Sequence, residues 1–226
     1  MKSNQLETPI ISVDIVIFVI SNKKLFVLTC KRTNDPFIGA PALPGTAIKI
    51  DETLEAASKR ALKEKTKFSN KIIKSISLNQ LATFDSLYRD PRGRTISVVY
   101  MGIYPEAPLN TDDILWIDAF DQPSGSMPFD HNLILNTAVS RLSGKLRYTT
   151  IAKSFLPENF RIEELQEIYE TILRRPLNKS NFRNKLIKIG IIEQVSILSN
   201  AVGKQGGRPP HIYKFSDKNI IERDFI

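Results

Sequence analysis

The sequence predicts a two-domain α/β protein, in which an α/β sandwich is followed by a smaller unit made of two helices and a hairpin. The chain has 226 residues and a mass of 25.6 kDa, which suits two compact domains of ordinary size. Its first part alternates β-branched runs with helical spacing, and after residue 146 the order becomes helix, turn, helix and hairpin. We therefore expect one domain in residues 1–148 and a second in residues 149–226.

Strands and helices alternate along the first predicted domain. The nearly continuous β-branched run at residues 10–20 is typical of a buried strand, and residues 24–30 follow it as a hairpin partner. Residues 51–68 have helical spacing, and either Asp51 or Thr53 can cap that helix. Strand-like segments follow at residues 72–81, 95–104 and 114–117, and a helix is expected at residues 131–142. This order favours an α/β sandwich.

The second predicted domain has the chain order of a winged helix-turn-helix. Residues 162–173 carry apolar side chains at spacings of three and four, which indicates an amphipathic helix, and Pro176 prevents its continuation. Asn178 can cap a second helix over residues 179–189, and Gly190 can end it. Strand-like runs at residues 192–198 and 210–215, joined by a glycine-rich basic loop, complete the predicted wing.

Composition excludes several classes of protein. Hydrophobic residues make up 42% and charged residues 25% of the chain, which is ordinary globular usage and not that of a disordered or fibrous protein. The longest apolar run falls short of the ~20 residues that a membrane span needs, and Asp14 interrupts it. With one cysteine and two histidines, the chain offers no disulfide framework and few nitrogen or sulfur metal ligands. We therefore expect a cytoplasmic protein with no membrane partner.

The formal charge of +8 is concentrated in the last third of the chain. Residues 146–226 hold 14 lysines and arginines against 9 acidic residues, and residues 171–189 hold six basic residues and no acid. Such clustering indicates a polyanion partner, and a recognition helix needs a polar, acid-free N-terminal half. We expect double-stranded operator DNA to contact Lys179, Ser180, Asn181, Arg183, Asn184 and Lys185 in the helix and Lys204 and Arg208 in the wing. The alternatives are a merely solvated helix face and a surface that binds an acidic protein.

A motif in the first domain, which follows Leu43-Pro44-Gly45, resembles the Nudix box, G-x5-E-x7-R-E-U-x-E-E-x-G-U with U aliphatic. The matching residues are Glu52, Arg60, Leu62, Glu64 and Phe68. The departures are Thr46 and Lys67 in place of the two glycines, and Ala61 and Lys65 in place of two core glutamates. The resemblance implies a loop, helix and loop on an α/β/α sandwich, which in that family binds divalent metal to hydrolyse nucleoside diphosphates linked to another group. The alternative is an ordinary surface helix that carries an Arg60–Glu64 pair.

The departures from the box bear on catalysis. Ala61 removes a carboxylate, and Lys65 puts a cation where the family binds its metal ion, at a cost of about 1 to 4 kcal/mol for like charges a few ångströms apart. We therefore expect no catalytic residue, no metal ion and no cofactor, but a degenerate Nudix domain that binds an effector without hydrolysing it. The alternative is an active hydrolase of nucleoside diphosphate derivatives with an accessory basic domain, in which Glu52, Glu64 and an acid from outside the box hold the metal.

Nearly the whole chain, roughly residues 8–216, is similar to the Nudix-related transcriptional regulators, members of which control genes of NAD metabolism or sugar catabolism. The similarity extends to residues 88–94 before a strand and residues 127–131 before a helix. It also covers Phe155-Leu156-Pro157, Asn181-Phe182-Arg183 and Gly207-Arg208-Pro209. It implies a homodimer on a pseudo-palindromic operator. The implied effector is ADP-ribose, another phosphorylated ribose derivative or a sugar.

Basic side chains of the first domain are the candidates for holding such an effector, because planar guanidinium groups suit phosphate. For Arg89 and Arg94 the alternative is structural pairing with Asp85, Asp90 or Glu64. Cys30 and Trp116 are expected in the core, and His131 is expected to cap or orient the helix that it begins. The predicted effector-binding set is Arg32, Arg60, Glu64, Lys65, Arg89, Arg92 and Arg94.

Overall fold

The computed structural model describes residues 8–104, 106, 110–122, 125–197 and 211–222. The chain divides into two compact units, one made of Met1–Val19 and Phe26–Ala138 and the other of Ile20–Leu25 and Val139–Ile226. The division falls inside helix α3 (His131–Tyr148), which therefore contributes one half to each unit. The sequence-based boundary after residue 148 coincides with the end of this helix and stays a prediction.

The first unit is built on a mixed sheet that has seven strands within the described residues. Its main path is β3-β2-β1-β6-β5, while β4 pairs with β1 and β7 pairs with β2. β1 runs parallel to β6 in a register that places Ser12 beside Ser97. A central strand that is buried on both faces needs a nearly continuous apolar run, which explains the composition of residues 10–20. The strands are β1 (Ile10–Ser21), β2 (Lys24–Lys31), β3 (Pro41–Ala42), β4 (Gly45–Ala47), β5 (Asn79–Phe84), β6 (Thr95–Ile103) and β7 (Ile114–Asp118).

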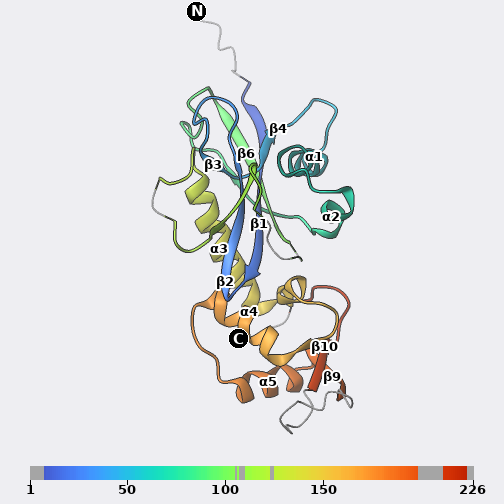
Figure 1. The fold of residues 1–226 in the computed structure, drawn as a ribbon. Coiled ribbons are helices and arrows are strands. Elements are labelled where there is room, and N and C mark those ends of the chain that lie inside the picture. Colours follow the sequence, from blue (N-terminus) through green and yellow to red (C-terminus); the bar gives the residue numbers. More distant parts are fainter. Residues whose placement is uncertain (1–7, 105, 107–109, 123–124, 198–210, 223–226) are drawn as a thin grey trace, which may run out of the picture. The chain divides into compact units, whose positions relative to one another are not determined.

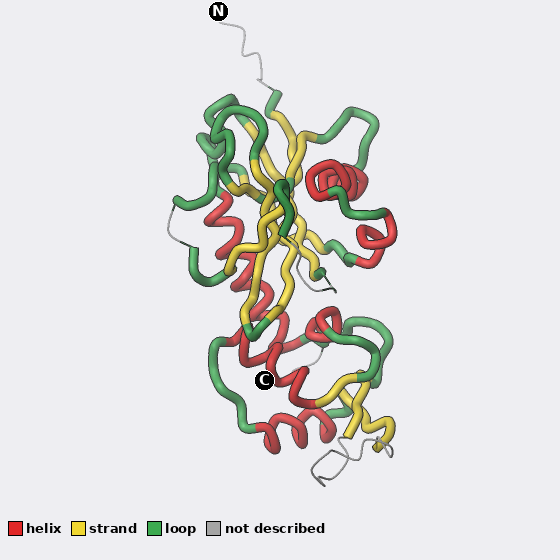
Figure 2. The backbone as a smooth tube through the Cα atoms, in the orientation of Figure 1, coloured by secondary structure: helices red, strands yellow, loops and turns green. Residues whose placement is uncertain are grey.

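Helices cover both faces of this sheet (Figures 1 and 2). Helices α1 (Leu54–Thr66) and α2 (Asn70–Ser75) lie on one side, and the first half of α3 lies on the other. The Thr53 hydroxyl accepts a hydrogen bond from the Ala56 N–H at 3.1 Å, so Thr53 and not Asp51 is the N-cap of α1. Ala61 and Leu62 are fully buried in the core between α1 and the sheet. The α/β/α sandwich implied by the Nudix resemblance is therefore confirmed.

The prediction of a single strand over residues 72–81 is wrong. The Ser69 hydroxyl accepts a hydrogen bond from the Ile72 N–H at 3.3 Å and caps α2, and strand β5 begins only at Asn79. A short apolar run carries too little periodicity to separate a helical turn from a strand. Helix α3 also extends beyond the predicted residues 131–142, because Leu142 and Leu146 are both buried one turn apart.

The second unit has the expected winged helix-turn-helix order. The rings of Tyr169 and Phe182 lie 5.0 Å apart between the two helices α4 and α5, and Arg174 adopts a left-handed backbone that ends α4. The strand order is β8-β10-β9, in which β8 and the short 3₁₀ helix before it were not predicted. None of the described helices combines the length and apolar character that crossing a bilayer requires. The elements are η1 (Ile151–Phe155), β8 (Phe160–Arg161), α4 (Ile162–Leu173), α5 (Lys179–Lys188), β9 (Ile192–Ile197) and β10 (His211–Phe215).

The substitution Asn178→Ala is expected to loosen α5, because the Asn178 side-chain oxygen accepts a hydrogen bond from the Asn181 N–H at 3.0 Å. Loss of such an N-cap costs about 1 kcal/mol, which corresponds to roughly fivefold faster amide exchange where the helix opens locally. Hydrogen–deuterium exchange of α5 measures the effect. In the control Asn181→Ala, an exposed position without a capping role, exchange should be unchanged or slower because alanine favours helix. Equal acceleration in both variants would contradict the capping role.

Candidate functional site

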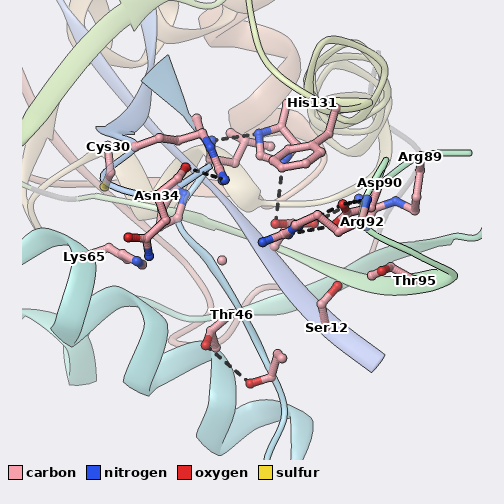
Figure 3. Close-up of a pocket in the computed structure, with 18 of the residues that line it drawn as sticks. Ser12, Cys30, Asn34, Thr46, Lys65, Arg89, Asp90, Arg92, Thr95 and His131 are labelled. Atoms are coloured by element: carbon pink, nitrogen blue, oxygen red, sulfur yellow. Dashed lines mark hydrogen bonds and ion pairs between the residues drawn. The ribbon is translucent and has the colours of Figure 1, made fainter. Parts of the chain in front are cut away.

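A cavity of about 400 Å³ opens on the first unit, and this volume suits a small-molecule ligand. Its walls come from β1, the end of β2, the segment around β4, the last turn of α1, the loop between β5 and β6, and the start of α3. Figure 3 shows Lys65 approaching from one side and Arg92 and His131 from another. Segments that are far apart in the sequence therefore meet in one polar hollow.

Cationic side chains on several of these segments give the cavity an anion-binding character. The guanidinium carbons of Arg32 and Arg92 lie 4.7 Å and 5.6 Å from the centre of the Phe129 ring. Burial, and then the positive charge of Arg92, lower the pKa of Arg32. An anion bound near both guanidinium groups would offset their mutual repulsion. Phe129 has a φ of +57°, a left-handed backbone that is uncommon for a bulky residue and concentrates at functional sites.

One buried arginine ties three segments of the wall together. The side chain of Arg89 is 4% exposed and donates two hydrogen bonds to the Asp130 carboxylate, at 2.9 Å from Nε and 2.7 Å from Nη2. Its Nη2 also donates to Oδ2 of Asp14 at 3.2 Å, and the Ser97 hydroxyl donates to the same oxygen at 2.6 Å. Burial lowers the pKa of Arg89, but the Asp130 hydrogen bonds and the Asp14 charge outweigh it and raise the pKa. The loop after β5 is thereby fixed to β1 and to the start of α3.

His131 holds the start of α3 against the segment before β4. Its Nδ1 accepts a hydrogen bond from the Leu43 N–H at 3.1 Å, which leaves the ring proton on Nε2, 3.6 Å from Oδ1 of Asp14. Burial lowers the pKa of His131, against the opposing effect of the Asp14 and Asp130 charges. These contacts support the predicted role of His131 in orienting the helix. His131 also lines the cavity, which the sequence analysis did not assign to it.

The structure brings together four of the seven residues predicted to hold an effector, namely Arg32, Lys65, Arg89 and Arg92. Arg94 does not line the cavity, and it donates to the backbone oxygen of Asp85 at 2.6 Å and not to the carboxylate considered above. Arg89 pairs with Asp130 and Asp14, which were not among the partners considered. Arg60 and Glu64 lie outside this cavity and line a second, more open hollow with Lys59, Lys63 and Lys74.

The retained carboxylates of the Nudix box are engaged by its retained arginine. Arg60 donates to both oxygens of Glu52, at 2.8 Å and 2.7 Å, and its Nη1 lies 3.4 Å from Glu64. The hydrogen bond from Arg60 is the main cause that lowers the pKa of Glu52 to about 2. Ala61 offers no ligand, and Lys65 lines the cavity as a cation. This set of side chains does not fit Mg²⁺, which requires converging oxygen ligands.

No other group takes the place of the lost ligands in the part of the chain that the structure describes. There, no three histidine, cysteine, aspartate or glutamate side chains come together as metal ligands. Cys30 lies in the wall of the cavity, where burial raises the pKa of its thiol to about 12, so it is a packed neutral group as expected. Trp116 is also buried, as expected, within the core beneath α1.

Asp14 and Asp130 are site residues that sequence reasoning missed, although β1 carries a signal for Asp14. Ser12 and Asp14 are polar residues two positions apart in an otherwise apolar strand, and Thr95 and Ser97 repeat that spacing in β6. Side chains alternate between the faces of a strand, so each pair points to one side of the sheet. The parallel register then places the two pairs next to each other, and Ser12, Asp14 and Thr95 line the cavity.

In the second unit, α5 turns its polar face to solvent. Phe182 and Leu186 are buried on its other face. Lys179 forms an ion pair with Glu163 of α4, and Arg183 donates to the side-chain oxygen of Asn184 at 3.0 Å. The predicted DNA-binding residues of the wing, Lys204 and Arg208, lie outside the described residues. On α5 the predicted residues that are exposed are Lys179, Ser180, Asn181, Asn184 and Lys185, and Arg183 is half-buried.

Comparison with known proteins finds family similarity in both units. Residues 10–121 match the model of the NUDIX domain, and residues 152–215 match that of the NrtR DNA-binding winged helix domain. The ADPR responsive transcriptional repressor NtrR of Acinetobacter baylyi is 33% identical over 222 residues, which cover 95% of this chain and 85% of the relative.

Solved structures agree with this similarity. Shewanella oneidensis NrtR complexed with a 27mer DNA is 28% identical, with a TM-score of 0.70 over 91% of this chain and 93% of the other. The NUDIX domain of the same protein complexed with ADP ribose is 29% identical, with a TM-score of 0.51 over 63% of this chain and 94% of the other. The structure with DNA matches nearly the whole chain, and the structure with ADP ribose matches its NUDIX part.

The lowered pKa of His131 predicts a loss of stability in mild acid. The unfolded chain binds a proton on this residue below about pH 6.5, where the folded chain still holds a neutral ring, so the free energy of unfolding falls as the pH falls below that value. His131→Asn keeps an acceptor for the Leu43 N–H and removes the titration. Urea unfolding should therefore show a smaller fall in stability between about pH 7.5 and about pH 5.5 for the variant than for the wild type. An identical pH dependence in the two proteins would refute the role of His131.

Proposed function

The chain belongs to the family of Nudix-related transcriptional regulators with an NrtR-type winged helix domain, and we propose that ADP-ribose or a related phosphorylated ribose binds its first domain and controls operator binding by the second. The observation that carries the effector assignment is the cavity lined by Arg32, Arg92 and Lys65. These cations suit the pyrophosphate of a nucleotide sugar, which carries two negative charges. The names of the relatives, an ADPR responsive repressor and a NUDIX domain complexed with ADP ribose, support the same ligand.

The effector is bound without hydrolysis in this proposal. Lys65 stands at a position where the Nudix box has a core glutamate, and it lines the cavity at the end of α1. Its ammonium group offsets ligand charge that a metal ion offsets in the hydrolases. Glu52 and Glu64, the remaining carboxylates of the box, lie against Arg60 instead. The carboxylates on which hydrolysis depends are thus paired with Arg60 or replaced by Ala61 and Lys65.

DNA binding is assigned to α5 together with the wing. The exposed polar face of α5 is rich in lysine and asparagine and contains no acid, so it can approach phosphates and base edges. The crystal structure of Shewanella oneidensis NrtR with a 27mer DNA supports this role. We further propose that residues 1–148 and 149–226 act as separate domains of a homodimer on a pseudo-palindromic operator. The effector then regulates by binding the DNA-bound and free arrangements with different affinities.

Lys65→Ala is expected to weaken ADP-ribose binding roughly tenfold, because it removes one cation from a partly enclosed site. Isothermal titration measures this affinity, and fluorescence anisotropy with a duplex selected from random sequences measures DNA affinity in the same proteins. DNA affinity without ligand should not change. The control Lys63→Ala, a neighbour on α1 that does not line the cavity, should leave both affinities intact.

Chromatography of the titrated samples with added Mg²⁺ tests the absence of hydrolysis directly. We expect intact ADP-ribose at the end of the titration. Turnover that is lost in Glu64→Gln would overturn the non-catalytic assignment, whereas undiminished ADP-ribose affinity in Lys65→Ala would overturn the role of the ammonium group.

Arg183→Ala is expected to reduce the preference for the selected duplex over random DNA, because a guanidinium can read guanine in the major groove. Lys185→Ala serves as the matched control. It should weaken binding to both DNAs alike and reduce the salt slope by about one, as loss of a phosphate contact does. Anisotropy titrations at several salt concentrations measure both quantities. The same effect of both variants on selected and random DNA would contradict this division of roles.

A further inference from the structure

The floor of the cavity has a different chemistry from its cationic walls. Ser12 and Asp14 of β1 and Thr95 of β6 line it with two hydroxyl groups and one carboxylate, all on one side of the sheet. Figure 3 shows the Ser12 and Thr95 side chains near each other on these two strands. Hydroxyl and carboxylate groups recognise other hydroxyl groups, whereas a carboxylate repels phosphate.

One oxygen of the Asp14 carboxylate is fully engaged and the other is not. Oδ2 accepts hydrogen bonds from Ser97 and Arg89. For Oδ1 no hydrogen bond is found from any described residue, and Nε2 of His131 lies 3.6 Å away, beyond hydrogen-bond reach. A carboxylate oxygen can accept two hydrogen bonds, so Oδ1 keeps unused acceptor capacity on a residue that lines the cavity.

A glycine at position 45 allows the Asp14 carboxylate to lie close against the backbone. A Cβ atom on Gly45 would lie 2.2 Å from Oδ1 of Asp14 and 2.8 Å from the Val13 backbone oxygen. Any other residue at position 45 would therefore press against the carboxylate. Oδ1 takes up the space that a Cβ atom would need, and Gly45 itself lines the cavity, so this close contact lies at the cavity wall.

We propose that Oδ1 of Asp14 accepts hydrogen bonds from hydroxyl groups of the terminal ribose of the effector, the sugar that carries no base. Asp14 would thereby select a nucleotide sugar over a plain nucleotide. This inference rests on the proposed function, because it assigns one end of the ligand to the floor of the same cavity. The cations hold the phosphates and the carboxylate holds the sugar. The ligand therefore binds in one orientation, with its terminal ribose at Asp14.

The base-free sugar fits the floor better than the adenosine end does. The described neighbours of Oδ1 are Gly45 and the imidazole of His131, and neither offers a phenyl or indole face to a base. Phe129 is the phenyl ring that lines the cavity, and the guanidinium group of Arg32 already lies over it. The terminal ribose needs no stacking surface and presents several hydroxyl groups. A buried acceptor strongly favours a ligand that has such hydroxyl groups over one that lacks them.

The test compares ADP-ribose with ADP, which lacks the terminal ribose, in the wild type and in Asp14→Asn. The variant should still fold, because Arg89 keeps both hydrogen bonds to Asp130 and the asparagine oxygen can accept from Ser97. We expect ADP-ribose affinity to fall roughly tenfold or more, since a hydrogen bond to a charged group is lost, and ADP affinity to change less than about threefold. Isothermal titration gives both affinities, and unchanged ADP binding reports an intact cavity.

Asp90→Asn is the matched control, since Asp90 is a second carboxylate of the cavity whose two oxygens are both occupied by Arg92, at 3.0 Å and 2.6 Å. This substitution should change the affinities for ADP-ribose and ADP by the same factor. An equal loss of both ligands in Asp14→Asn, or no loss of either, would overturn the sugar assignment while leaving the proposed effector in place. Failure of the wild-type protein to bind ADP-ribose would instead overturn the proposed function.

Discussion

The buried guanidinium of Arg89 is the interaction on which the architecture of the site depends. It joins two carboxylates, Asp14 from the centre of the sheet and Asp130 from the start of α3, and so holds three separate segments in one arrangement. Removing one partner from a buried ion pair typically costs about 3–5 kcal/mol, because the remaining charge is left unpaired. The loop that carries Arg89 also carries Arg92, and the segment beside Asp130 carries Phe129. The segments that carry Arg92 and Phe129 are therefore positioned by the ion pairs of Arg89.

A second ion pair explains how the Nudix helix keeps its shape without its metal chemistry. Arg60 binds Glu52 through two hydrogen bonds and connects the loop before α1 to the middle of the helix. Thr53 caps the start of α1, and Lys67 adopts a φ of +56° at its end, where the box has a glycine. These local interactions need no metal ion. The loop, helix and loop can therefore persist while the metal-binding positions change to Ala61 and Lys65, and the fold alone does not indicate hydrolysis.

Long periodic segments and capping residues made most of the fold predictable from the sequence. Helix α4 was predicted to the residue, and α5 to within one residue, because apolar spacing, Pro176 and Asn178 all agree. The segment of residues 72–81 was misassigned because two adjacent isoleucines fit a helical turn and a strand equally well. Within the cavity, charge type alone pointed to Arg32, Lys65 and Arg92. It did not separate them from Arg94, whose backbone partners are set by tertiary contacts.

Asp14 illustrates why the remaining part of the site was not predictable in the same way. In the sequence it is a single acid within an apolar strand, and its meaning depends on Arg89 and Ser97, which reach it from 75 and 83 residues away. A site made only of cations binds any polyphosphate of suitable size, because Coulomb attraction has little directional preference. A carboxylate fixed at one end of such a site disfavours phosphate there and favours hydroxyl groups. Selectivity thus requires both signs of charge, and the same arginine that makes a buried carboxylate tolerable in the sheet also fixes where that carboxylate points.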